Sequence, residues 1–411
     1  HGMVHMEAGP NMGDIIDVGT RGTLERIRDG ERHLSVHFAA SGAGAGTQGL
    51  VWAVPGCSKI LSGGGFPYRQ HETDEHTLGF SPGQYAAEST AIDFAIAAFL
   101  RAIPREGSAE PVGVGLAASV ASTEVHRGSH RVHAAVITDA GCQITSLTLM
   151  KGVGDAARAR DGRTADLLAL HALFYALGIP AGLGDEDSAF VFDSGHDVVR
   201  LTMPADDLAL ERLLANPLVL SDCRRRPASD IVSARTMLHA GTFDPPHPGH
   251  VEGALAALDE RHLKGSVTTR LIHALTLDPP NKPRVTVADA LRRARALGRM
   301  GRDLLVSSGD PLFVDKAERY PGAVFAVGAD TAIRLLEPRW GIPPAEVLTR
   351  FERAGTRLYV VGREVTLDGR TEFVTLEHPW LKTLVPSDYW FMFTHVPGRW
   401  DVSSTQLRAA A

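Results

Sequence analysis

The sequence predicts an α/β protein with two domains, and three observations lead to this expectation. The chain has 411 residues, and domains of about 100–200 residues are the rule, so two domains are expected. Hydrophobic residues make up 44% of the chain and charged residues 22%. This is ordinary globular usage, which excludes disorder as the main state. Strand-like and helix-like segments alternate in both halves, which favours parallel α/β architecture in each.

Charge, hydropathy and cysteine usage exclude several classes of protein. The 42 basic and 48 acidic residues give a formal net charge of -6, whereas nucleic-acid-binding domains usually carry a basic face. No apolar run is as long as the roughly 18 residues that a membrane span needs, and the residues after Met3 are too polar for a secretory signal. Cys57, Cys142 and Cys223 lie far apart without a CxxC pair, which argues against a disulfide framework or a structural zinc site. We expect a cytoplasmic protein without nucleic-acid or membrane partners.

The N-terminal half, residues 1–222, is expected to contain the following elements in order. They are a charged helix over 20–34, a strand over 35–40 that ends in the glycine-rich turn 41–47, a helix over 81–102, a buried strand over 112–121, a strand pair over 131–136 and 144–150, and a helix over 164–177. Ser81-Pro82 is typical of a helix start, because a hydroxyl caps the helix and proline suits its first turn. Asp139-Ala140-Gly141 predicts the turn between the paired strands.

The composition of the sequence changes between residues 222 and 232. A basic break, Arg224-Arg225-Arg226-Pro227, is followed by polar residues, and a helix is expected before it over 206–219. We therefore place a domain boundary here and expect a second domain over 233–411. It opens with a strand over 236–240 and alternates strand and helix to its end.

The strongest chemical signal is the loop from Gly241 to His250, which lies between that strand and a helix over 251–259. It reads Gly241-Thr242-Phe243-Asp244-Pro245-Pro246-His247-Pro248-Gly249-His250. The N-terminus of a helix offers unpaired amide donors and partial positive charge to a phosphate. His247 and His250 add donors, and Gly249 permits a close approach of the backbone. The loop predicts a nucleotide-phosphate site, although two histidines in one loop are equally compatible with a plain surface.

A second signal lies near the C-terminus, in Asp401-Val402-Ser403-Ser404-Thr405-Gln406-Leu407-Arg408. Hydroxyl groups beside a helix start either cap the helix or donate to phosphate oxygens. Arg408, about one turn later, has the planar fork that suits a phosphate. Each motif alone leaves both interpretations open, whereas the two in order favour phosphate binding.

The two motifs together resemble the (H/T)xGH and SSTxxR signatures of the nucleotidylyltransferase superfamily. Within it, the chain is most similar to the nicotinamide/nicotinate mononucleotide adenylyltransferases. Gly328-Ala329-Asp330, after a strand, resembles their GAD motif, Trp340 stands near the position of an aromatic beside the pyridine ring, and Lys282 lies in a loop similar to their Asn/Lys-Pro loop. Trp340 can equally be a packing residue, Lys282 a solvated one, and Asp330 a turn former. A KMSKS-like partner is absent, which disfavours the aminoacyl-tRNA synthetases.

This resemblance implies a Rossmann-like domain that transfers an adenylyl group from ATP to a pyridine mononucleotide, with release of pyrophosphate, in NAD biosynthesis. His247, His250 and Arg408 would act on the phosphates, and the nucleotide would contact Gly241, Thr242, Phe243, Gly249, Gly328, Asp330, Ser403, Ser404 and Thr405. Lys282 and Trp340 would contact the acceptor. Mg²⁺ would come with ATP, without a protein metal site. CTP, another phosphorylated acceptor such as phosphopantetheine, or nucleotide sensing without turnover stay open, as does a homo-oligomer.

Residues 30–180 resemble a different family, the CinA C-terminal domains, which are nicotinamide-nucleotide amidases. Ser41 lies where that family has its nucleophile loop, and Phe66-Pro67-Tyr68 lies at its aromatic segment. The family's lysine, five residues after the tyrosine, is Thr73 here. Because a serine nucleophile needs an adjacent base, we expect Ser41 and Tyr68 to form a degenerate amidase site.

Two further patterns carry little weight. Gly42, Gly44 and Gly46 do not have the spacing of a dinucleotide fingerprint, and no suitable acidic residue follows. His126, His130 and His133 could form a metal cluster, but they are interpreted here as solvated histidines.

Overall fold

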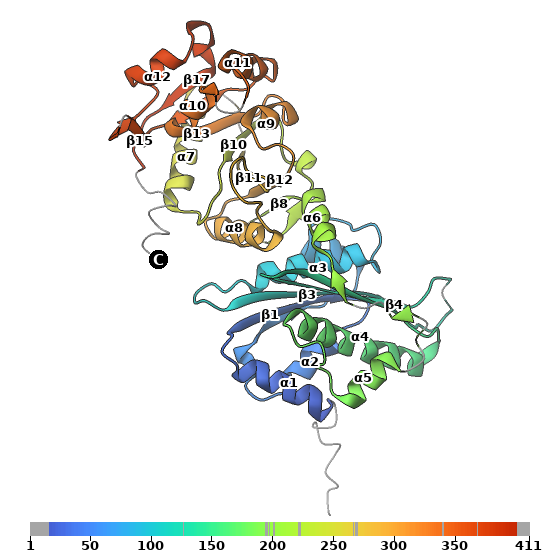
Figure 1. Ribbon diagram of the computed structural model, residues 1–411. Coiled ribbons are helices and arrows are strands. Elements are labelled where there is room, and N and C mark those ends of the chain that lie inside the picture. The colour runs from blue at the N-terminus through green and yellow to red at the C-terminus, as the bar shows by residue number, and fades with distance from the viewer. Residues whose placement is uncertain are drawn as a thin grey trace, which may run out of the picture. The chain divides into compact units, whose positions relative to one another are not determined.

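The structure is a computed structural model that describes residues 16–125, 127–193, 196, 198–199, 202–220, 223–265, 267, 270–338, 341–367 and 369–400 (Figure 1). The chain folds into two compact units that divide between Arg212 and Leu213. Each unit is built on its own sheet, which confirms the expected two-domain α/β class. Among the described residues, no helix combines the length and the apolar character that a bilayer crossing requires.

The first unit is built on a seven-stranded mixed sheet in the order β2-β1-β3-β4-β5-β6, with β7 also paired to β5. Its strands are β1 (Leu34–Ser41), β2 (Leu61–Gly65), β3 (Glu110–Ser119), β4 (Arg131–Thr138), β5 (Gly141–Thr148), β6 (Val198–Val199) and β7 (Met203–Pro204). β1 is parallel to β2 and β3, whereas β4 and β5 form the antiparallel hairpin that Asp139-Ala140-Gly141 predicts. The expected parallel arrangement therefore holds for β2, β1 and β3, whereas β4 and β5 depart from it, because the tight turn returns the chain directly beside β4.

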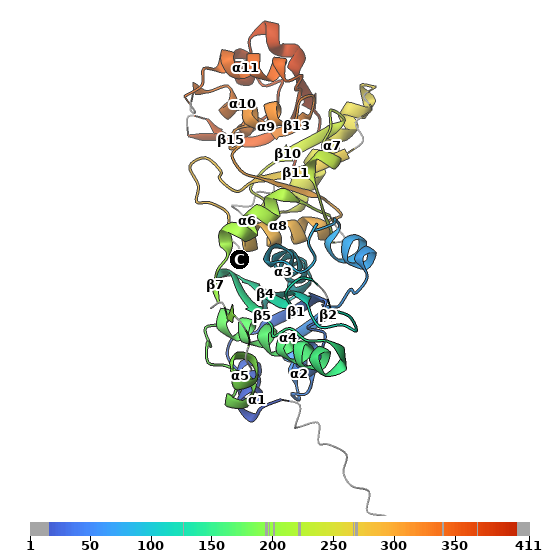
Figure 2. The same ribbon diagram turned by 90° about the vertical axis from the view of Figure 1, so that its right-hand side faces the viewer.

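Helices cover both faces of the first sheet (Figures 1 and 2). One face is covered by α1 (Val18–Asp29), α2 (Gly46–Trp52), α4 (Gly154–Ala176) and α5 (Asp185–Phe192), and the other by α3 (Glu88–Ala102). α6 (Asp206–Ala215) follows β7, η2 (Cys57–Lys59) is a short 3₁₀ turn, and η3 (Glu72–Leu78) is a π-helix. α3 is almost wholly buried. It packs closely on β3 because a side chain at Gly113 or Gly115 would collide with the α3 backbone.

Three helix boundaries differ from the sequence prediction. α3 begins at Glu88 rather than at Ser81, and the Ser81 hydroxyl lies 3.5 Å from the Tyr85 hydroxyl instead of capping a helix. α1 ends at Asp29, and α4 begins ten residues before Thr164, at Gly154. The sequence prediction missed the first ten residues of α4 because a glycine usually interrupts a helix. Gly154 instead begins α4, in a conformation with φ of 82° that glycine adopts readily.

The second unit is built on an eight-stranded sheet in the order β17-β14-β13-β10-β11-β12-β8-β9. Six strands are mutually parallel: β10 (Thr236–Ala240), β11 (Arg270–Thr276), β12 (Leu304–Ser307), β13 (Val324–Gly328), β14 (Leu358–Val361) and β17 (Phe393–Val396). β8 (Leu218–Val219) and β9 (Arg225–Arg226) add an antiparallel edge, and β15 (Arg363–Leu367) pairs with β16 (Arg370–Val374) in a separate hairpin. The expected parallel sheet of the C-terminal half is present.

Helices cover both faces of this sheet, because successive side chains of β10 point to opposite faces and are buried on both. Leu238 faces the core under α9 (Phe313–Arg319), α10 (Ala329–Leu335), α11 (Pro344–Arg353) and α12 (Pro379–Leu384), whereas Met237 faces the core under α7 (Pro248–Leu263). α8 (Val287–Arg299) follows β11, and η4 (Ala228–Asp230) and η6 (Ser387–Met392) are short turns. The strand order runs outward from β10 in one direction and from β13 in the other. Their neighbouring ends form the switch point where ligands bind in open α/β sheets.

Candidate functional site

A cavity of about 670 Å³ opens at the ends of the central strands of the second sheet. Ala240 at the end of β10, Thr276 at the end of β11 and Gly328 at the end of β13 all line it. Its size lies within the range of roughly 300–1,000 Å³ that is typical of small-molecule sites. The cavity brings together Gly241, Thr242, His247, His250, Lys282, Gly328 and Asp330, all of which the sequence predicts to be functional.

The N-terminus of α7 forms one wall of this cavity. His247 is the N-cap residue in an extended conformation, and Pro248 occupies the first helical position, where its missing N–H costs nothing. The backbone N–H of His247 donates to Nδ1 of His250 at 3.3 Å. His250 therefore takes the role that Glu or Gln plays in a capping box. Because Nδ1 of His250 accepts this bond, the neutral ring carries its proton on Nε2, which leaves a donor for a ligand.

His247 stacks on His250, with ring centroids 3.7 Å apart and 27° between the planes. The side chain of His247 is only 2% exposed, yet neither of its ring nitrogens has a hydrogen-bond partner among the described residues. Buried polar groups are almost always paired, and each exception needs an explanation. The cavity beside the ring supplies one, because a bound anion would satisfy these nitrogens.

Burial and neighbouring cations keep both histidines neutral. Burial lowers the pKa of His250 to about 3, with smaller contributions from His247 and Arg363. Burial also lowers the pKa of His247, and the charge of Arg363 adds to this effect. Both rings consequently act as neutral groups near pH 7, and the positive potential of the wall comes from the helix N-terminus and from Arg363.

Two of the loop residues that are predicted to contact the nucleotide, Phe243 and Gly249, do not line the cavity. Phe243 is fully buried beneath the loop with φ of 49°, and its ring packs edge-on against His250 with centroids 5.2 Å apart. Gly249 is buried in the first turn of α7. Phe243 thus supports the histidine ring from below, a role that sequence spacing could not distinguish from nucleotide contact.

Gly328 and Asp330 of the GAD segment also line the cavity. Gly328 ends β13 and caps α10, and a side chain there would lie against Asp330 and only 3.0 Å from Cγ of Arg363. Asp330 forms an ion pair with Arg334, one turn later on α10. Gly328 is therefore required to let Arg363 approach the strand end.

Arg363 is a site residue that sequence reasoning missed. It lines the cavity directly after β14, and its Nη1 donates to the carbonyl of Trp400 at 2.7 Å. Trp400 lines the same cavity. Its position along the chain could have indicated it, because Arg363 closely follows a buried strand of four apolar residues, Leu358–Val361, whose end lies beside the switch point.

A second polar group that the sequence did not predict lies beside the cavity, at the ends of β11 and β12. Asp310 is buried, and its carboxylate accepts hydrogen bonds from Ser307 at 2.6 Å and from Thr276 at 3.3 Å. Lys316, also buried and lining the cavity, forms an ion pair with Asp310 at 3.3 Å. Lys282 lines the cavity from an exposed loop position. Trp340, Ser403, Ser404, Thr405 and Arg408 lie outside the described residues.

The predicted amidase residues of the first unit are placed differently. Ser41 ends β1 and is half-buried, whereas Tyr68 is 76% exposed. Thr73, at the position where the amidase lysine was expected, is only 1% exposed, and its hydroxyl donates to the carbonyl of Arg69 at 3.3 Å. The side chain at this position is thus directed into the protein.

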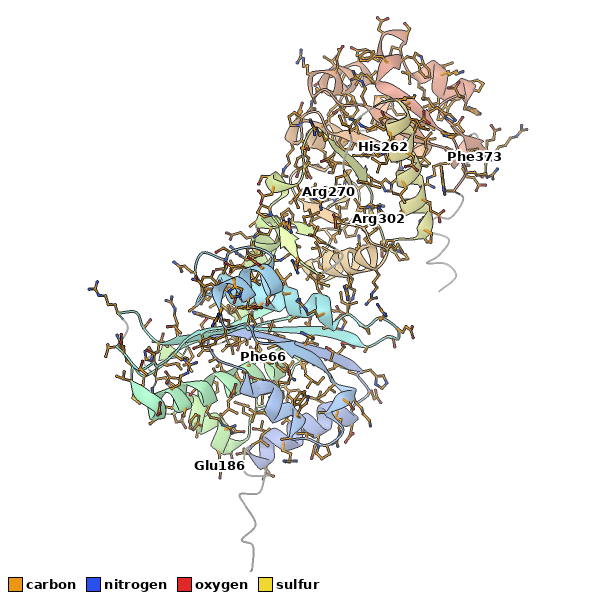
Figure 3. All side chains as sticks on the ribbon, turned by 180° about the vertical axis from the view of Figure 1, so that it is seen from behind. Phe66, Glu186, His262, Arg270, Arg302 and Phe373 are labelled. Carbon is orange, nitrogen blue, oxygen red and sulfur yellow. The ribbon has the colours of Figure 1, made fainter. Side chains whose placement is uncertain are left out.

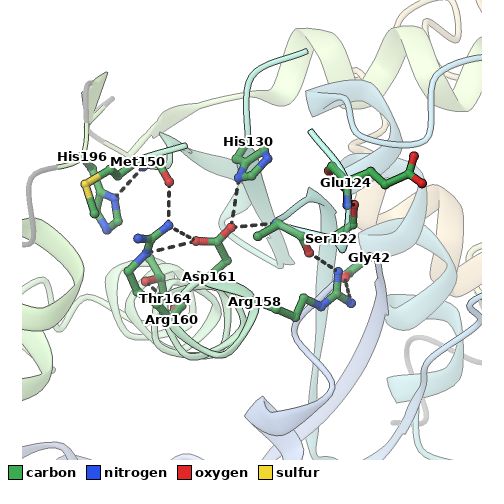
Figure 4. Close-up of polar contacts among 11 residues, drawn as sticks. Gly42, Ser122, Glu124, His130, Met150, Arg158, Arg160, Asp161, Thr164 and His196 are labelled. Atoms are coloured by element: carbon green, nitrogen blue, oxygen red, sulfur yellow. Dashed lines mark hydrogen bonds and ion pairs between the residues drawn. The ribbon is translucent and has the colours of Figure 1, made fainter. Parts of the chain in front are cut away.

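The glycine-rich turn of this unit has a structural role. A side chain at Gly42 would collide with the carbonyl of Ala118, and one at Gly46 would collide with Asp166. Arg158 donates to the carbonyl of Gly42 at 3.1 Å (Figure 4). These glycines therefore permit close packing of the chain on itself.

The interpretation of His130 and His133 as solvated histidines is wrong. His130 is buried, and its Nδ1 lies 3.2 Å from the buried carboxylate of Asp161, which also accepts from the backbone of Ala121 at 2.8 Å and from Arg160 at 2.7 Å (Figure 4). His133 makes a 2.8 Å hydrogen bond with Ser146. His126 lies outside the described residues. The structure pairs each described histidine separately, because strand pairing turns them toward different partners.

Comparisons with known proteins found one matching family and several similar solved structures. Residues 238–410 match the family described as "Cytidylyltransferase-like". Solved structures similar to the N-terminal part include the competence-damaged protein (CinA) superfamily protein from Enterobacter cloacae, with 16% identity, a TM-score of 0.32 and coverage of 43% of this chain and 99% of that chain. Another is the competence/damage inducible protein from Agrobacterium tumefaciens, with 18% identity, a TM-score of 0.31 and coverage of 40% and 97%. No curated protein matches the chain. Residues 238–410, which contain the residues that line the cavity at the switch point, are thus similar to the cytidylyltransferase-like family.

Proposed function

We propose that the second unit transfers the adenylyl group of ATP to the phosphate of a pyridine mononucleotide, nicotinamide or nicotinate, with release of pyrophosphate, as a step of NAD biosynthesis. The observation that carries this proposal is the pair of stacked histidines at the N-terminus of α7, with both ring nitrogens of His247 unpartnered among the described residues beside the cavity. The family match over residues 238–410 supports nucleotidyl transfer as the reaction class.

The chemistry proposed needs no covalent intermediate with the protein. An oxygen of the acceptor's phosphate attacks the α-phosphorus of the nucleotide, and the bond from that phosphorus to the bridging oxygen breaks. The electron pair leaves with pyrophosphate. Catalysis is then positioning and stabilisation of developing negative charge. His250 donates through Nε2, the amides at the start of α7 contact the phosphates, and Arg363 supplies fixed positive charge.

Magnesium fits this proposal as part of the nucleotide substrate. The described residues contain no group of three or more His, Cys, Asp or Glu side chains that could hold a metal ion. Mg²⁺ keeps several waters and commonly binds substrate phosphates. We therefore assign it to the triphosphate oxygens, where it offsets their charge.

The remainder of the cavity supports an acceptor that has both an anionic group and a flat apolar group. Lys282 offers a cation, whereas Leu312, Phe313 and Ile342 line an apolar part. The ring of Phe313 is held edge-on against Phe325, with centroids 5.5 Å apart. A pyridine mononucleotide has these two features at opposite ends.

The experiment that tests this proposal measures pyrophosphate release with Mg²⁺, each of the four common nucleoside triphosphates and a panel of acceptors. The panel contains nicotinamide mononucleotide, nicotinate mononucleotide, phosphopantetheine and a blank without acceptor. Release with ATP and one pyridine mononucleotide, lost in His250→Ala and retained in His262→Ala, is expected. His262 is a suitable control because it lies on the exposed last turn of α7 (Figure 3). No release with any pair would contradict the proposal.

A cytidylyl transfer is the alternative that one specific observation favours, because the family match is described as cytidylyltransferase-like. The nucleotide panel decides between the two: turnover with CTP and not with ATP replaces the adenylyl proposal. Tight binding of a nucleotide without pyrophosphate release would instead indicate a sensing protein.

For the first unit we propose that no amide is hydrolysed. Thr73 provides no base and is directed into the protein, and Tyr68 is exposed. Incubation of the full chain with nicotinamide mononucleotide should release no ammonia above that of a Ser41→Ala variant. Ammonia release that depends on Ser41 would refute this part of the proposal.

A further inference from the structure

Four histidines from three elements of the second unit form a cluster behind the phosphate-facing wall. His247 and His250 come from α7, His239 from β10 and His273 from β11; these four are called the histidine cluster below. His239 and His273 are direct neighbours across the parallel strands, with ring centroids 5.2 Å apart. The ring of His239 lies 6.0 Å from that of His250, and His239 also lines the cavity. The cluster thus connects the cavity wall to the interior of the sheet.

The cluster is short of hydrogen-bond partners. Both ring nitrogens of His247, both of His273 and Nδ1 of His239 are buried without a partner among the described residues. A protein that only needed to fill this space would gain by using apolar side chains, because a buried unpaired polar group costs free energy. Four polar rings at one place, one of them stacked on another, point to a role in binding charge.

The charged groups that shift the pKa values of the cluster are positive, although Asp330, Glu337 and Glu364 line other parts of the same cavity. The titratable and charged groups that act on His239 are His273, His250 and His247, together with Arg363, the first residue of β15. Arg302, after α8, acts on His273. Burial lowers the pKa of His239 well below its usual value, lowers that of His273 to about 4, and lowers that of His250 to about 3. Without a bound anion, the histidine cluster is consequently neutral at physiological pH.

From this arrangement we infer that the histidine cluster takes up one proton when a polyphosphate binds, and that His247 receives it. The inference rests on the proposed function of the cavity. A neutral imidazole presents one N–H and one lone pair, and the lone pair would repel phosphate oxygens. Only the imidazolium form of His247 has two N–H donors, so only this form can donate hydrogen bonds to two phosphate oxygens. The negative charge of the polyphosphate, which Mg²⁺ offsets only in part, favours that state.

The geometry assigns the proton to His247 rather than to His250. Nδ1 of His250 accepts the backbone N–H of His247 at 3.3 Å, and a proton on that nitrogen would break the cap of α7. No comparable bond holds either nitrogen of His247. The 3.7 Å stack also limits the pair to one positive charge, because two imidazolium rings at that separation would repel each other.

Proton uptake makes the affinity for the nucleotide depend on pH. Binding of the anion raises the pKa of His247, so protons are taken up at pH values between the pKa of the free ring and that of the bound ring. By linkage, the dissociation constant then rises with pH by up to about tenfold per pH unit within this window. At pH values above the pKa of the bound ring, the dependence disappears.

The test is isothermal titration calorimetry of the full chain with ATP and saturating Mg²⁺ at pH 7, in two buffers that differ in ionisation enthalpy. The difference between the two heats reports the number of protons taken up from the buffer. The wild-type protein should take up about one proton more than His247→Asn. Asparagine is a good N-cap residue, so this variant should keep α7 intact while it lacks a titrating ring. His262→Asn, on the exposed end of α7, should behave as the wild type.

The outcomes separate this inference from the proposed function. Protonation of the nucleotide itself is common to all variants and cancels when they are compared. If MgATP and magnesium pyrophosphate fail to bind the wild-type protein, the proposed function fails. If MgATP binds but the wild type and His247→Asn take up equal numbers of protons, the function stands and the proton-uptake inference is overturned. A dissociation constant that is independent of pH between 6 and 9 in the wild type would overturn it as well.

Discussion

The two nitrogens of His250 have separate tasks in this structure, and two substitutions can separate them. Nδ1 accepts the backbone N–H of His247, and Nε2 carries the proton that would face the nucleotide. In His250→Asn, the amide oxygen can replace Nδ1, but no atom reaches the position of Nε2. In His250→Gln, the longer side chain places an amide N–H near the position of Nε2 and gives up the Nδ1 position. The pair therefore tests the donor and the cap one at a time.

The expected magnitudes follow from these two bonds. Loss of one preorganised donor to developing charge costs about 100- to 1,000-fold in kcat. Loss of a helix cap costs about 1 kcal/mol of stability. His250→Asn should thus lose about 100- to 1,000-fold in kcat with nearly unchanged stability. His250→Gln should retain more activity than His250→Asn and lose about 1 kcal/mol of unfolding free energy.

Pyrophosphate release at saturating substrates measures kcat, and urea unfolding followed by tryptophan fluorescence measures the stability. Fluorescence reports mainly on the second unit, because four of the five tryptophans (Trp340, Trp380, Trp390 and Trp400) belong to it. Trp52, in the first unit, is already 62% exposed. If His250→Asn keeps kcat within tenfold of the wild type, Nε2 is not a phosphate donor and the reasoning is refuted.

Three further predictions concern the interior of the two units. Asp310→Asn leaves the buried Lys316 cation without its counter-charge, so we expect a loss of about 3–5 kcal/mol, most of which returns in the double variant with Lys316→Met; equal unfolding midpoints for Asp310→Asn and the wild type in urea would contradict this. The pKa of His273 is about 4 when folded and 6.5 when unfolded, so the unfolded chain binds the proton first as the pH falls. Stability is therefore complete above pH 6.5 and falls by about 3 kcal/mol toward pH 4, and His273→Leu should show a shallower fall in urea unfolding at graded pH. Gly115→Ala drives a methyl group into the α3 backbone and should destabilise the first unit by about 1–3 kcal/mol or more, whereas Gly49→Ala, which meets no atom within 4 Å, should be neutral or slightly stabilising; hydrogen exchange of β3 amides distinguishes them.

Much of the second unit is predictable from sequence because the loop and the helix start that line its cavity are local patterns. β10 has the bounds that the apolar run over 236–240 predicts, and α7 begins within the proline-histidine loop. The loop glycines, the helix start and the histidines lie within ten residues, so their spacing alone brings them together. The same locality explains why the hairpin of β4 and β5 was predicted correctly from its turn.

The features that were missed depend on contacts between distant segments. The start of α3 is set by packing on β3 rather than by Ser81-Pro82, and the buried pairing of His130 with Asp161 joins residues 31 positions apart. Their sequence surroundings contain no sign of these partners. Local chemistry predicted a cap and a solvated ring, and tertiary contacts replaced both.

The sequence alone predicted residues that line the cavity: the histidines of the α7 loop and Gly328 and Asp330 of the GAD segment are recognised by their type and order along the chain. Only the tertiary structure decided their protonation state and which side chains are their neighbours. Burial holds the pKa of His250 near 3, and strand order places His239, His273 and Arg363 beside it. The reason is physical: hydrogen-bonding groups are a property of residue type, whereas desolvation and electrostatic coupling depend on distances that exist only after the strands have assembled.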